Sequence, residues 1–436
     1  MSSVAQPSGA RRRALVIIGG GMAAIRLLEE LERYEDVRYD VTIFGDERHF
    51  GYNRIQLSPV LAGEKRSDEL ALKPENWYQQ RAVRVLSGAK HKVVAVDRAR
   101  RTVRTAEGYV YPYDRLVFAS GSKPALPPWF SALSSDPALM AFRSLDDVER
   151  MQALASAMMA SNTGAPSAVV VGAGLLGLEA AYGLNKLGFS VTVVHRAATI
   201  LNRQLDGTAA RLLQKALEAS GVRFQLEANI SSVELIECAG RKHAVKSISL
   251  INGRSLGAEL LVVAVGITPE DELGRHCGLQ TSSGIVVNDC MQTSDPAIYA
   301  IGECVSHRRT SFGMVAPLYD QARVCANHLG ERGYDYFVQR PLSARLKISG
   351  INLFSMGDIS ETSSGTARPE RREMLLSVPE AGIYKRLIIT GGALAGVVLY
   401  GDTRDAGWYQ SLIESGHSVE AFADALLHGQ RYLAAA

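Results

Sequence analysis

The apolar positions of the chain follow one motif twice: a short apolar run, a glycine turn and an amphipathic helix. In the first copy, residues 15–18 are all apolar, and Ile25, Leu28 and Leu31 then recur at helical spacing. In the second copy, the predicted strand covers residues 167–171 and the helical pattern covers 178–187. Each copy therefore predicts a buried parallel strand that turns sharply into a helix.

The turn between strand and helix carries the first chemical signal in both copies. A pyrophosphate can bind the backbone N–H groups at the start of a helix only where no side chain stands in the way. Both turns have small residues at the spacing that this close approach requires. The predicted contact residues are Gly19, Gly21 and Ala24 in the first turn and Gly172, Gly174 and Gly177 in the second.

The residues after the second strand of each copy differ. Asp46 and Glu47 follow the apolar residues 41–44, where an acid can accept hydrogen bonds from the ribose hydroxyls of an adenosine. The second copy has His195 and Arg196 at this place and no carboxylate. Arg196 could pair with the 2′-phosphate of NADP, or it could face solvent beside a ribose held by His195. The sequence leaves both NADH and NADPH open.

Two dinucleotide turns, about one domain length apart, suggest two cofactors in one chain. The chemistry that needs two dinucleotides is hydride transfer between a nicotinamide and a flavin. The alternative is a duplicated fold that binds a single type of cofactor. We therefore expect FAD at the first turn and NAD(P)H at the second.

Composition narrows the classes of partner. The 436 residues include 48 Lys and Arg against 45 Asp and Glu, and so small an excess argues against nucleic acid as the main partner. No apolar stretch approaches the roughly 18 residues that span a membrane. The five cysteines begin at Cys238 and form no CxxC, so we expect no metal site and no secreted disulfide framework. A reducing compartment, the cytoplasm, fits this usage.

Four further segments, at residues 52–63, 116–122, 260–269 and 293–304, resemble the two-dinucleotide-binding FAD/NAD(P)H reductases. The resemblance implies an α/β fold with two Rossmann-like three-layer domains and a C-terminal α+β interface domain. The implied boundaries are 1–145 and 271–332 for the FAD domain, 146–270 for the inserted NAD(P) domain and 333–436 for the interface domain.

Within that family the chain is most similar to the flavoprotein part of assimilatory nitrite reductase large subunits. The segment 52–63, Glu303 within Gly-Glu-Cys, the segment 315–317 and the segment 384–402 carry this similarity. Those larger subunits continue into iron–sulfur and sirohaem modules with clustered cysteines, and this chain reaches Ala436 without them. We therefore expect an electron-transfer subunit that cannot reduce nitrite alone. Pro59 stands where rubredoxin and ferredoxin reductases commonly carry a lysine, which counts against a plain ferredoxin reductase.

The resemblance also implies roles for single residues, and none of them is a catalytic side chain beyond the flavin itself. Glu179 would reach the nicotinamide, or it could be a helix-terminal acid stabilised by the helix dipole. Arg54 would face the FAD diphosphate or shape the flavin pocket, or it could be a solvated surface residue. The implied FAD contacts are Arg54, Ser120, Gly121, Gly302, Glu303 and Pro317, and the implied NAD(P)H contacts are Glu179 and Gly266.

The cysteine positions bear on the second half of the reaction. Disulfide reductases of this architecture need a cysteine pair soon after the first motif, and related peroxidases and oxidases need one cysteine there. This chain has none before Cys238, and Cys304 is expected to be a packed small residue. Electrons would therefore pass to an external redox protein: a nitrite or nitrate reductase catalytic subunit, a ferredoxin or a rubredoxin.

The sequence leaves the partner's docking surface and the oligomeric state open, including a homo-oligomer. Two basic segments, 307–309 and 98–104, could receive an acidic partner or be solvated loops. Three functions follow: an electron-transfer reductase of the nitrite or nitrate system, a rubredoxin or ferredoxin reductase, or a flavin-binding interaction protein with incidental redox activity.

Overall fold

The computed structural model divides the chain into two compact units, which we describe separately. The first unit is Met1–Arg54, Asp68–Lys123 and Ile267–Gln339, and the second is Ile55–Ser67, Pro124–Gly266 and Arg340–Ala436. The structure describes residues 12–34, 39–133, 136–160, 164–238, 241–346, 348–360 and 370–433.

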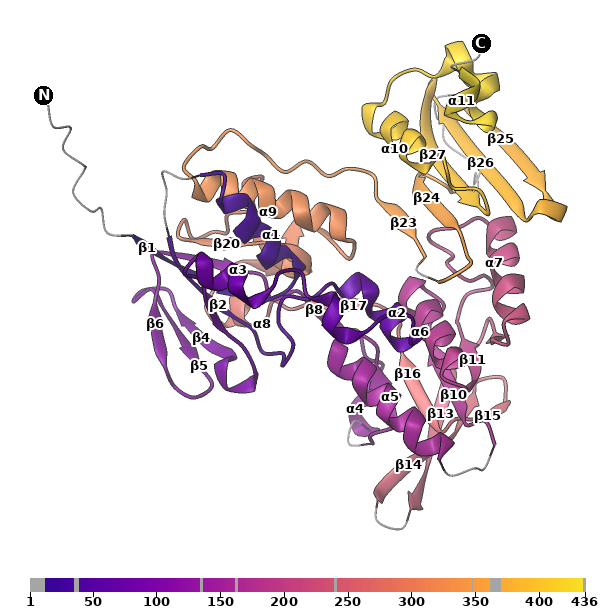
Figure 1. The fold of residues 1–436 in the computed structure, drawn as a ribbon, viewed down its shortest axis with the longest axis horizontal. Helices are drawn as coiled ribbons and strands as arrows, with labels where there is room; N and C mark the ends of the chain where they lie inside the picture. Colours follow the sequence, from indigo (N-terminus) through magenta and orange to yellow (C-terminus); the bar gives the residue numbers. More distant parts are fainter. Residues whose placement is uncertain are drawn as a thin grey trace, which may run out of the picture. The chain divides into compact units, whose positions relative to one another are not determined.

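The first unit is built on a parallel five-stranded sheet with the motif at its centre. Helices α1 (Met22–Leu31) and α9 (Val315–Leu329) lie side by side against it (Figure 1). A small antiparallel sheet shares the same apolar core, so that the unit has three layers. The parallel sheet has the order β20 (Ile298–Ala300), β7 (Arg115–Phe118), β1 (Arg13–Ile18), β2 (Tyr39–Phe44) and β3 (Arg84–Leu86), and the small sheet comprises β4 (Val93–Asp97), β5 (Thr102–Thr105) and β6 (Val110–Pro112).

The second unit repeats this topology. Its central strand is paired in parallel on both sides, as β1 is in the first unit. The sheet has the order β12 (Arg223–Gln225), β11 (Ser190–Val194), β10 (Ser167–Val171), β16 (Leu260–Val263) and β9 (Leu139–Ala141). The principal helices are α5 (Leu145–Met159), α6 (Leu175–Lys186) and α7 (Gly207–Ala219).

The uninterrupted apolar runs of the two central strands follow from their burial on both faces. Leu15 and Ile17 of β1 are fully buried, and so is Val170 of β10. A strand covered on both sides by other layers has no solvent face on which a polar residue would be favoured. This is why the apolar signal is continuous there and not alternating.

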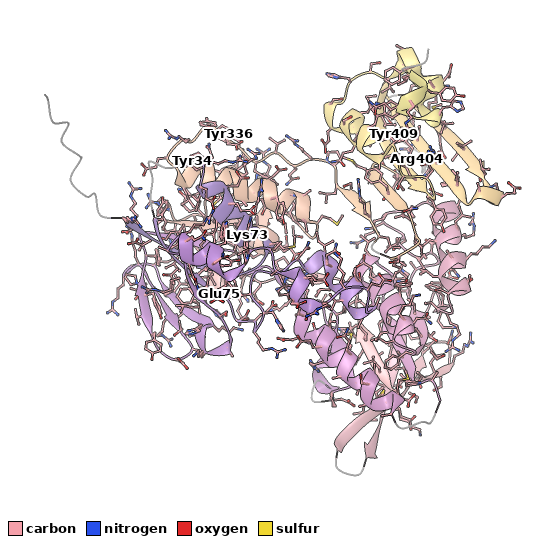
Figure 2. All side chains as sticks on the ribbon, viewed as in Figure 1. Tyr34, Lys73, Glu75, Tyr336, Arg404 and Tyr409 are labelled. Carbon is pink, nitrogen blue, oxygen red and sulfur yellow. The ribbon has the colours of Figure 1, made fainter. Side chains whose placement is uncertain are left out.

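The C-terminal part of the second unit is an antiparallel sheet with helices packed on it. Tyr409, labelled in Figure 2, is fully buried in its core, and its hydroxyl donates to the Leu426 carbonyl at 2.6 Å. The expected class, two Rossmann-like domains with a C-terminal α+β domain, is confirmed. The sheet has the order β23 (Ser343–Arg345), β24 (Leu353–Gly357), β27 (Ala393–Tyr400), β26 (Ile383–Thr390) and β25 (Arg371–Val378), and α10 (Ala406–Ser415) packs on it.

The short helix α2 (Leu57–Leu61) groups with the second unit, although the residues just before it belong to the first. It packs on α6, and a Cβ atom at Gly183 would lie 2.8 Å from the side chain of Leu61. The remaining elements are α3 (Glu75–Gln80), β8 (Ser122–Pro124), α4 (Pro128–Leu133), β13 (Ile230–Cys238), β14 (Arg241–Leu250), β15 (Ser255–Gly257), β17 (Ile267–Pro269), α8 (Glu272–His276), β18 (Thr281–Ser282), β19 (Gly284–Val287), β21 (Val305–His307), β22 (Thr310–Ser311) and α11 (Gln430–Leu433).

Among the helices in the described part of the chain, none has the length and apolarity needed to cross a membrane.

Candidate functional site

The first glycine of each turn is required by the polypeptide itself. Gly19 has a φ of +112° and Gly172 a φ of +110°, a region that favours glycine. A Cβ atom at Gly19 would lie 2.1 Å from the carbonyl oxygen of Ala119, and one at Gly172 would lie 2.3 Å from that of Ala264. Each turn therefore passes directly against the neighbouring strand's end.

The second glycine of each turn is not required by the polypeptide. Gly21 and Gly174 have ordinary φ values of −83° and −78°, and no atom lies within 4 Å of the place where a Cβ would be. Each is the N-cap of its helix and contributes no side-chain hydrogen bond to the first turn. An open space in front of such helix N–H groups fits a diphosphate.

The third residue of each motif, Ala24 or Gly177, lies where the helix packs on the turn. A Cβ at Gly177 would lie 2.0 Å from the Gly172 carbonyl oxygen, so only glycine fits there. The first turn has Ala24 at this position, which is fully buried. The two turns thus share their geometry but differ in how closely helix and strand approach.

The acids after β2 occupy two different environments. Glu47 accepts a hydrogen bond from the Tyr52 hydroxyl at 2.6 Å and pairs with Arg54, whose guanidinium lies 4.9 Å from the Tyr52 ring centre. Burial alone would lower the pKa of Arg54, but Tyr52, Glu47 and Glu303 outweigh it and raise the pKa. Asp46 is exposed, 3.4 Å from the Lys92 ammonium. Arg54 is therefore a held, charged group and not a solvated surface arginine.

The second predicted FAD segment meets the 116–122 segment in this unit. Ser122 Oγ donates to Glu303 Oε2 at 2.7 Å, and Gly302 before it has a φ of +90°. Two hydrogen bonds join residues 120–121 to Glu270. Ser120 Oγ donates to the Glu270 carbonyl at 2.7 Å, and the Glu270 N–H donates to the Gly121 carbonyl at 2.9 Å. Pro317 is buried in the first turn of α9.

Gln321 of α9 was not predicted from the sequence. It is fully buried, and its Oε1 accepts the Gly302 N–H at 2.7 Å. Its Nε2 has no hydrogen-bond partner among the described residues. Gly302 lies close to the turn, since a Cβ there would be 3.4 Å from Cβ of Ala23. A buried unpaired donor costs about 1–3 kcal/mol, so an acceptor from a bound molecule is expected here.

The second site has an imidazole where the first has acids. His195 Nδ1 accepts the Ala173 N–H at 3.3 Å, within the glycine turn. Burial lowers the pKa of His195, which keeps the imidazole neutral and able to accept this bond. Arg196 is exposed, and no carboxylate of the described residues pairs with it. Its guanidinium is therefore available to an anionic ligand.

Glu179 and Gly266 also lie in the second unit. Glu179 is only 8% exposed, lies beyond the first turn of α6 and accepts a hydrogen bond from Ser58 Oγ at 3.2 Å. It is therefore not a helix-terminal acid held by the dipole. Gly266 has a φ of +131°, and its carbonyl accepts the Ala125 N–H at 2.9 Å.

The described cysteines are not suited to nucleophilic chemistry. Cys304 is fully buried, and burial raises the pKa of its thiol, which disfavours the thiolate. Its Sγ donates to the Ile301 carbonyl at 3.2 Å. Cys304 is therefore the packed residue that the sequence predicts.

The basic segment 307–309 contacts one carboxylate, that of Asp289. His307 is 1% exposed with its Nε2 2.8 Å from Asp289, and Arg308 pairs with the same carboxylate at 2.8 Å. In the other segment, Arg98 pairs with Asp295 at 2.9 Å. Neither segment presents the full positive charge that its sequence suggests.

The chain has two glycine turns with open space before their helices. One turn lies beside acids and the other beside an imidazole. This arrangement is that of an oxidoreductase that binds two dinucleotides. A model of the pyridine nucleotide-disulphide oxidoreductase family matches residues 13–327, and a model of the rubredoxin NAD+ reductase C-terminal domain matches 343–417. The chain therefore belongs to the pyridine nucleotide-disulphide oxidoreductase family. Members of this family use FAD and NAD(P)H.

Relatives agree with this membership. The chain is 39% identical to the assimilatory nitrate reductase electron transfer subunit of Bacillus subtilis, over 93% of this chain and 49% of that protein. It is 33% identical to the rubredoxin-NAD(+) reductase of Pseudomonas putida, over 70% of this chain and 75% of that protein. A ferredoxin reductase structure from Rhodopseudomonas palustris matches with a TM-score of 0.82 and 25% identity, over 98% of this chain and 100% of that one. The chain spans about half the length of the nitrate and nitrite reductase relatives.

The open space at Gly21 and Gly174 predicts selective loss of each cofactor. In Gly21→Ala the added methyl group would occupy the diphosphate space, and we expect FAD affinity to fall about tenfold, which corresponds to about 1.4 kcal/mol. Gly174→Ala should raise the KM for NAD(P)H by a similar factor while flavin content stays normal. FAD titration and steady-state kinetics measure the two effects. Gly407 also has open space around it but lies outside both turns, so Gly407→Ala is the control and should leave both cofactor affinities unchanged. Unchanged cofactor affinity in both variants would contradict the assignment.

The unpaired amide of Gln321 predicts a second effect on FAD. Gln321→Glu keeps an acceptor for the Gly302 N–H but replaces the donor with a negative charge, so FAD affinity should fall at least about tenfold. Asn327→Asp is the matched control on the same helix, because the Asn327 Oδ1 accepts the N–H groups of Tyr334 and Asp335. It should lower the melting temperature without weakening FAD. Equal FAD affinity in Gln321→Glu and the parent protein would refute the prediction.

Proposed function

We propose that this chain is an NAD(P)H-dependent, FAD-containing electron-transfer reductase that serves a nitrite or nitrate reductase system. One observation carries the proposal: two dinucleotide turns are present, while residues 1–237 contain no cysteine. The family is named for disulphide chemistry, but the sequence around the first turn contains no cysteine pair to receive electrons. The similarity to an assimilatory nitrate reductase electron transfer subunit supports the acceptor.

The residues of the first unit fit FAD. The backbone at Gly21 would hold the diphosphate, Asp46 or Glu47 the adenosine ribose, and Glu303 with Gln321 the region between diphosphate and flavin. When bound, FAD accepts hydride from the nicotinamide and passes electrons onward. The protein's own contribution is placement, since no acid or base is needed at the reacting atoms. Arg54, fixed by Glu47, would add positive charge beside the anionic diphosphate.

The residues of the second unit fit NAD(P)H. Gly174 would leave room for its diphosphate, His195 would hold its ribose and Arg196 would be available for a 2′-phosphate. Glu179 is held by Ser58 and is assigned to the nicotinamide side. We assign residues 1–145 and 271–332 to the FAD domain, 146–270 to the NAD(P) domain and 333–436 to the interface domain. Two segments of the first range, α2 and β9, group with the second unit and go with the NAD(P) domain instead. The four described thiols are free, which supports a reducing compartment such as the cytoplasm.

A rubredoxin or ferredoxin reductase is the second candidate, and a specific observation favours it. A model of the rubredoxin NAD+ reductase C-terminal domain matches residues 343–417, and the chain is 33% identical to a rubredoxin-NAD(+) reductase. Pro59 at the position of the lysine common in those reductases speaks against it.

One anaerobic experiment tests the proposal. The purified protein is mixed with NADH or NADPH while flavin absorbance is followed, and then a nitrite reductase catalytic subunit, a ferredoxin or a rubredoxin is added. We expect rapid loss of flavin absorbance and reoxidation by the nitrite reductase subunit. Reoxidation by rubredoxin or ferredoxin alone would favour the second candidate. Absence of bound flavin would refute both, and reduction without turnover of any acceptor would indicate a flavin-binding interaction protein.

Arg196 predicts the choice between the two nicotinamide nucleotides. If it pairs with the 2′-phosphate, Arg196→Glu should raise the KM for NADPH about 10- to 100-fold, since charge-assisted hydrogen bonds contribute about 1.5–3 kcal/mol. The KM for NADH should stay unchanged. Arg211→Glu, an exposed arginine on α7, is the control. Equal effects of Arg196→Glu on both nucleotides would leave no role for a 2′-phosphate contact.

A further inference from the structure

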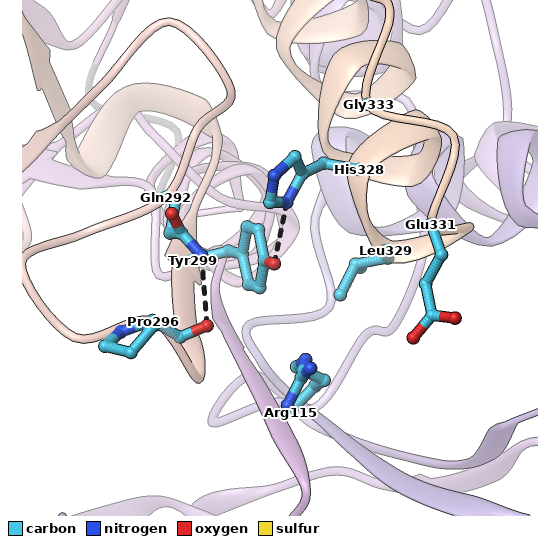
Figure 3. A pocket seen from close by; sticks show the side chains of 8 residues that line it. All are labelled: Arg115, Gln292, Pro296, Tyr299, His328, Leu329, Glu331 and Gly333. Atoms are coloured by element: carbon cyan, nitrogen blue, oxygen red, sulfur yellow. Dashed lines mark hydrogen bonds between the residues drawn. The ribbon is translucent and has the colours of Figure 1, made fainter.

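A cavity of about 350 Å³ opens at one edge of the first unit's parallel sheet, where β20 is the edge strand. Figure 3 shows the residues that line it. Arg115 at the start of β7, Tyr299 of β20 and His328 near the end of α9 line it, together with Gln292 and Glu331. Its volume lies within the range of small-ligand pockets, roughly 300–1,000 Å³.

The cavity lining contains one guanidinium, that of Arg115, and one carboxylate, that of Glu331. Arg115 is half-buried, and its Nη1 donates only to the neighbouring Asp114 carbonyl, at 3.0 Å. No carboxylate of the described residues forms an ion pair with Arg115. Glu331 at the rim is paired with Arg13. A partly desolvated guanidinium that forms no ion pair favours an anion from outside the chain.

The other polar groups of the cavity add no negative charge. The Tyr299 hydroxyl lies 2.8 Å from His328 Nδ1. Burial raises the pKa of Tyr299 to about 12, and burial together with Arg115 lowers the pKa of His328, so both rings are neutral at pH 7. Gln292 Nε2 donates to the Pro296 carbonyl at 3.1 Å, and the Gln292 side chain also interacts with the Tyr299 hydroxyl. The amide has two N–H groups.

The cavity is separate from the dinucleotide site of the same unit. In the parallel sheet, Arg115 of β7 lies opposite Leu15 of β1. The glycine turn begins at Gly19, four residues further along β1 and therefore roughly 13 Å away at about 3.3 Å per residue. Parallel α/β sheets bind their dinucleotides at the carboxyl ends of the strands, and this cavity lies at the amino ends.

We propose that this cavity binds a small oxoanion, a phosphate group or a carboxylate, with Arg115 as its counter-charge and Gln292 as a second donor. Phosphate and carboxylate oxygens match the planar guanidinium, which can donate two parallel hydrogen bonds to them. The proposal does not depend on the identity of the electron acceptor.

Calorimetric titration of the flavin-loaded protein tests the proposal, with inorganic phosphate and acetate as separate probes at constant ionic strength. We expect saturable binding of at least one probe that weakens tenfold or more in Arg115→Met and several-fold in Gln292→Met. Arg81→Met removes an arginine of the same unit that pairs with Glu32, and it should bind as the parent does. Binding of phosphate alone would indicate a phosphate ligand, and binding of acetate as well would include carboxylates.

The nucleotide sites also accept phosphate, so the test compares the affinity for each probe in the parent protein with that in the variants. Equal affinity and stoichiometry in the parent, Arg115→Met and Gln292→Met would overturn the proposal, as would absence of saturable binding in the parent. Melting temperature and flavin content show whether Arg115→Met is folded. If Arg115→Met is not folded, the same comparison of affinities is made between the parent protein and Gln292→Met.

Discussion

The close approach of a cofactor diphosphate to bare backbone shapes both Rossmann-like domains. Space for it is present twice, at Gly21 and at Gly174, where no atom of the described residues lies within 4 Å of the place of a Cβ. The helix N–H groups can reach a phosphate only because the central strand, the turn and the helix hold a fixed relation. That relation in turn requires the left-handed Gly19 and Gly172 and strands buried on both faces.

The same fold occurs twice in the chain, and the two sites differ in the charged and polar side chains beside the turn. The first turn is followed by acids and by a held Arg54, and the second by a neutral imidazole and an unpaired Arg196. A flavin and a nicotinamide together perform hydride transfer without protein nucleophiles. The buried, protonated Cys304 and the absence of earlier cysteines agree with a flavin that has no thiol partner in this chain.

The sequence predicted the fold class and the two glycine turns because both depend on local pattern: continuous apolar strands and residue spacing. It did not reveal Gln321, because its bond to the Gly302 N–H joins residues that are distant in sequence and a buried glutamine on a helix looks ordinary. It also did not show that Asp289, which pairs with Arg308 and lies 2.8 Å from His307 Nε2, reaches this segment from another loop. Nor did it show that α2 groups with the second unit, a matter of tertiary packing on α6.

A count of thiols before and after reduction by NAD(P)H tests most sharply whether this flavin passes its electrons out of the chain. The flavin-loaded protein is reduced anaerobically, alkylated under denaturing conditions and analysed by mass spectrometry. We expect full flavin reduction with all five cysteines alkylated both before and after. The appearance of two new thiols on reduction would contradict this, because electrons would then pass to a disulfide within the chain.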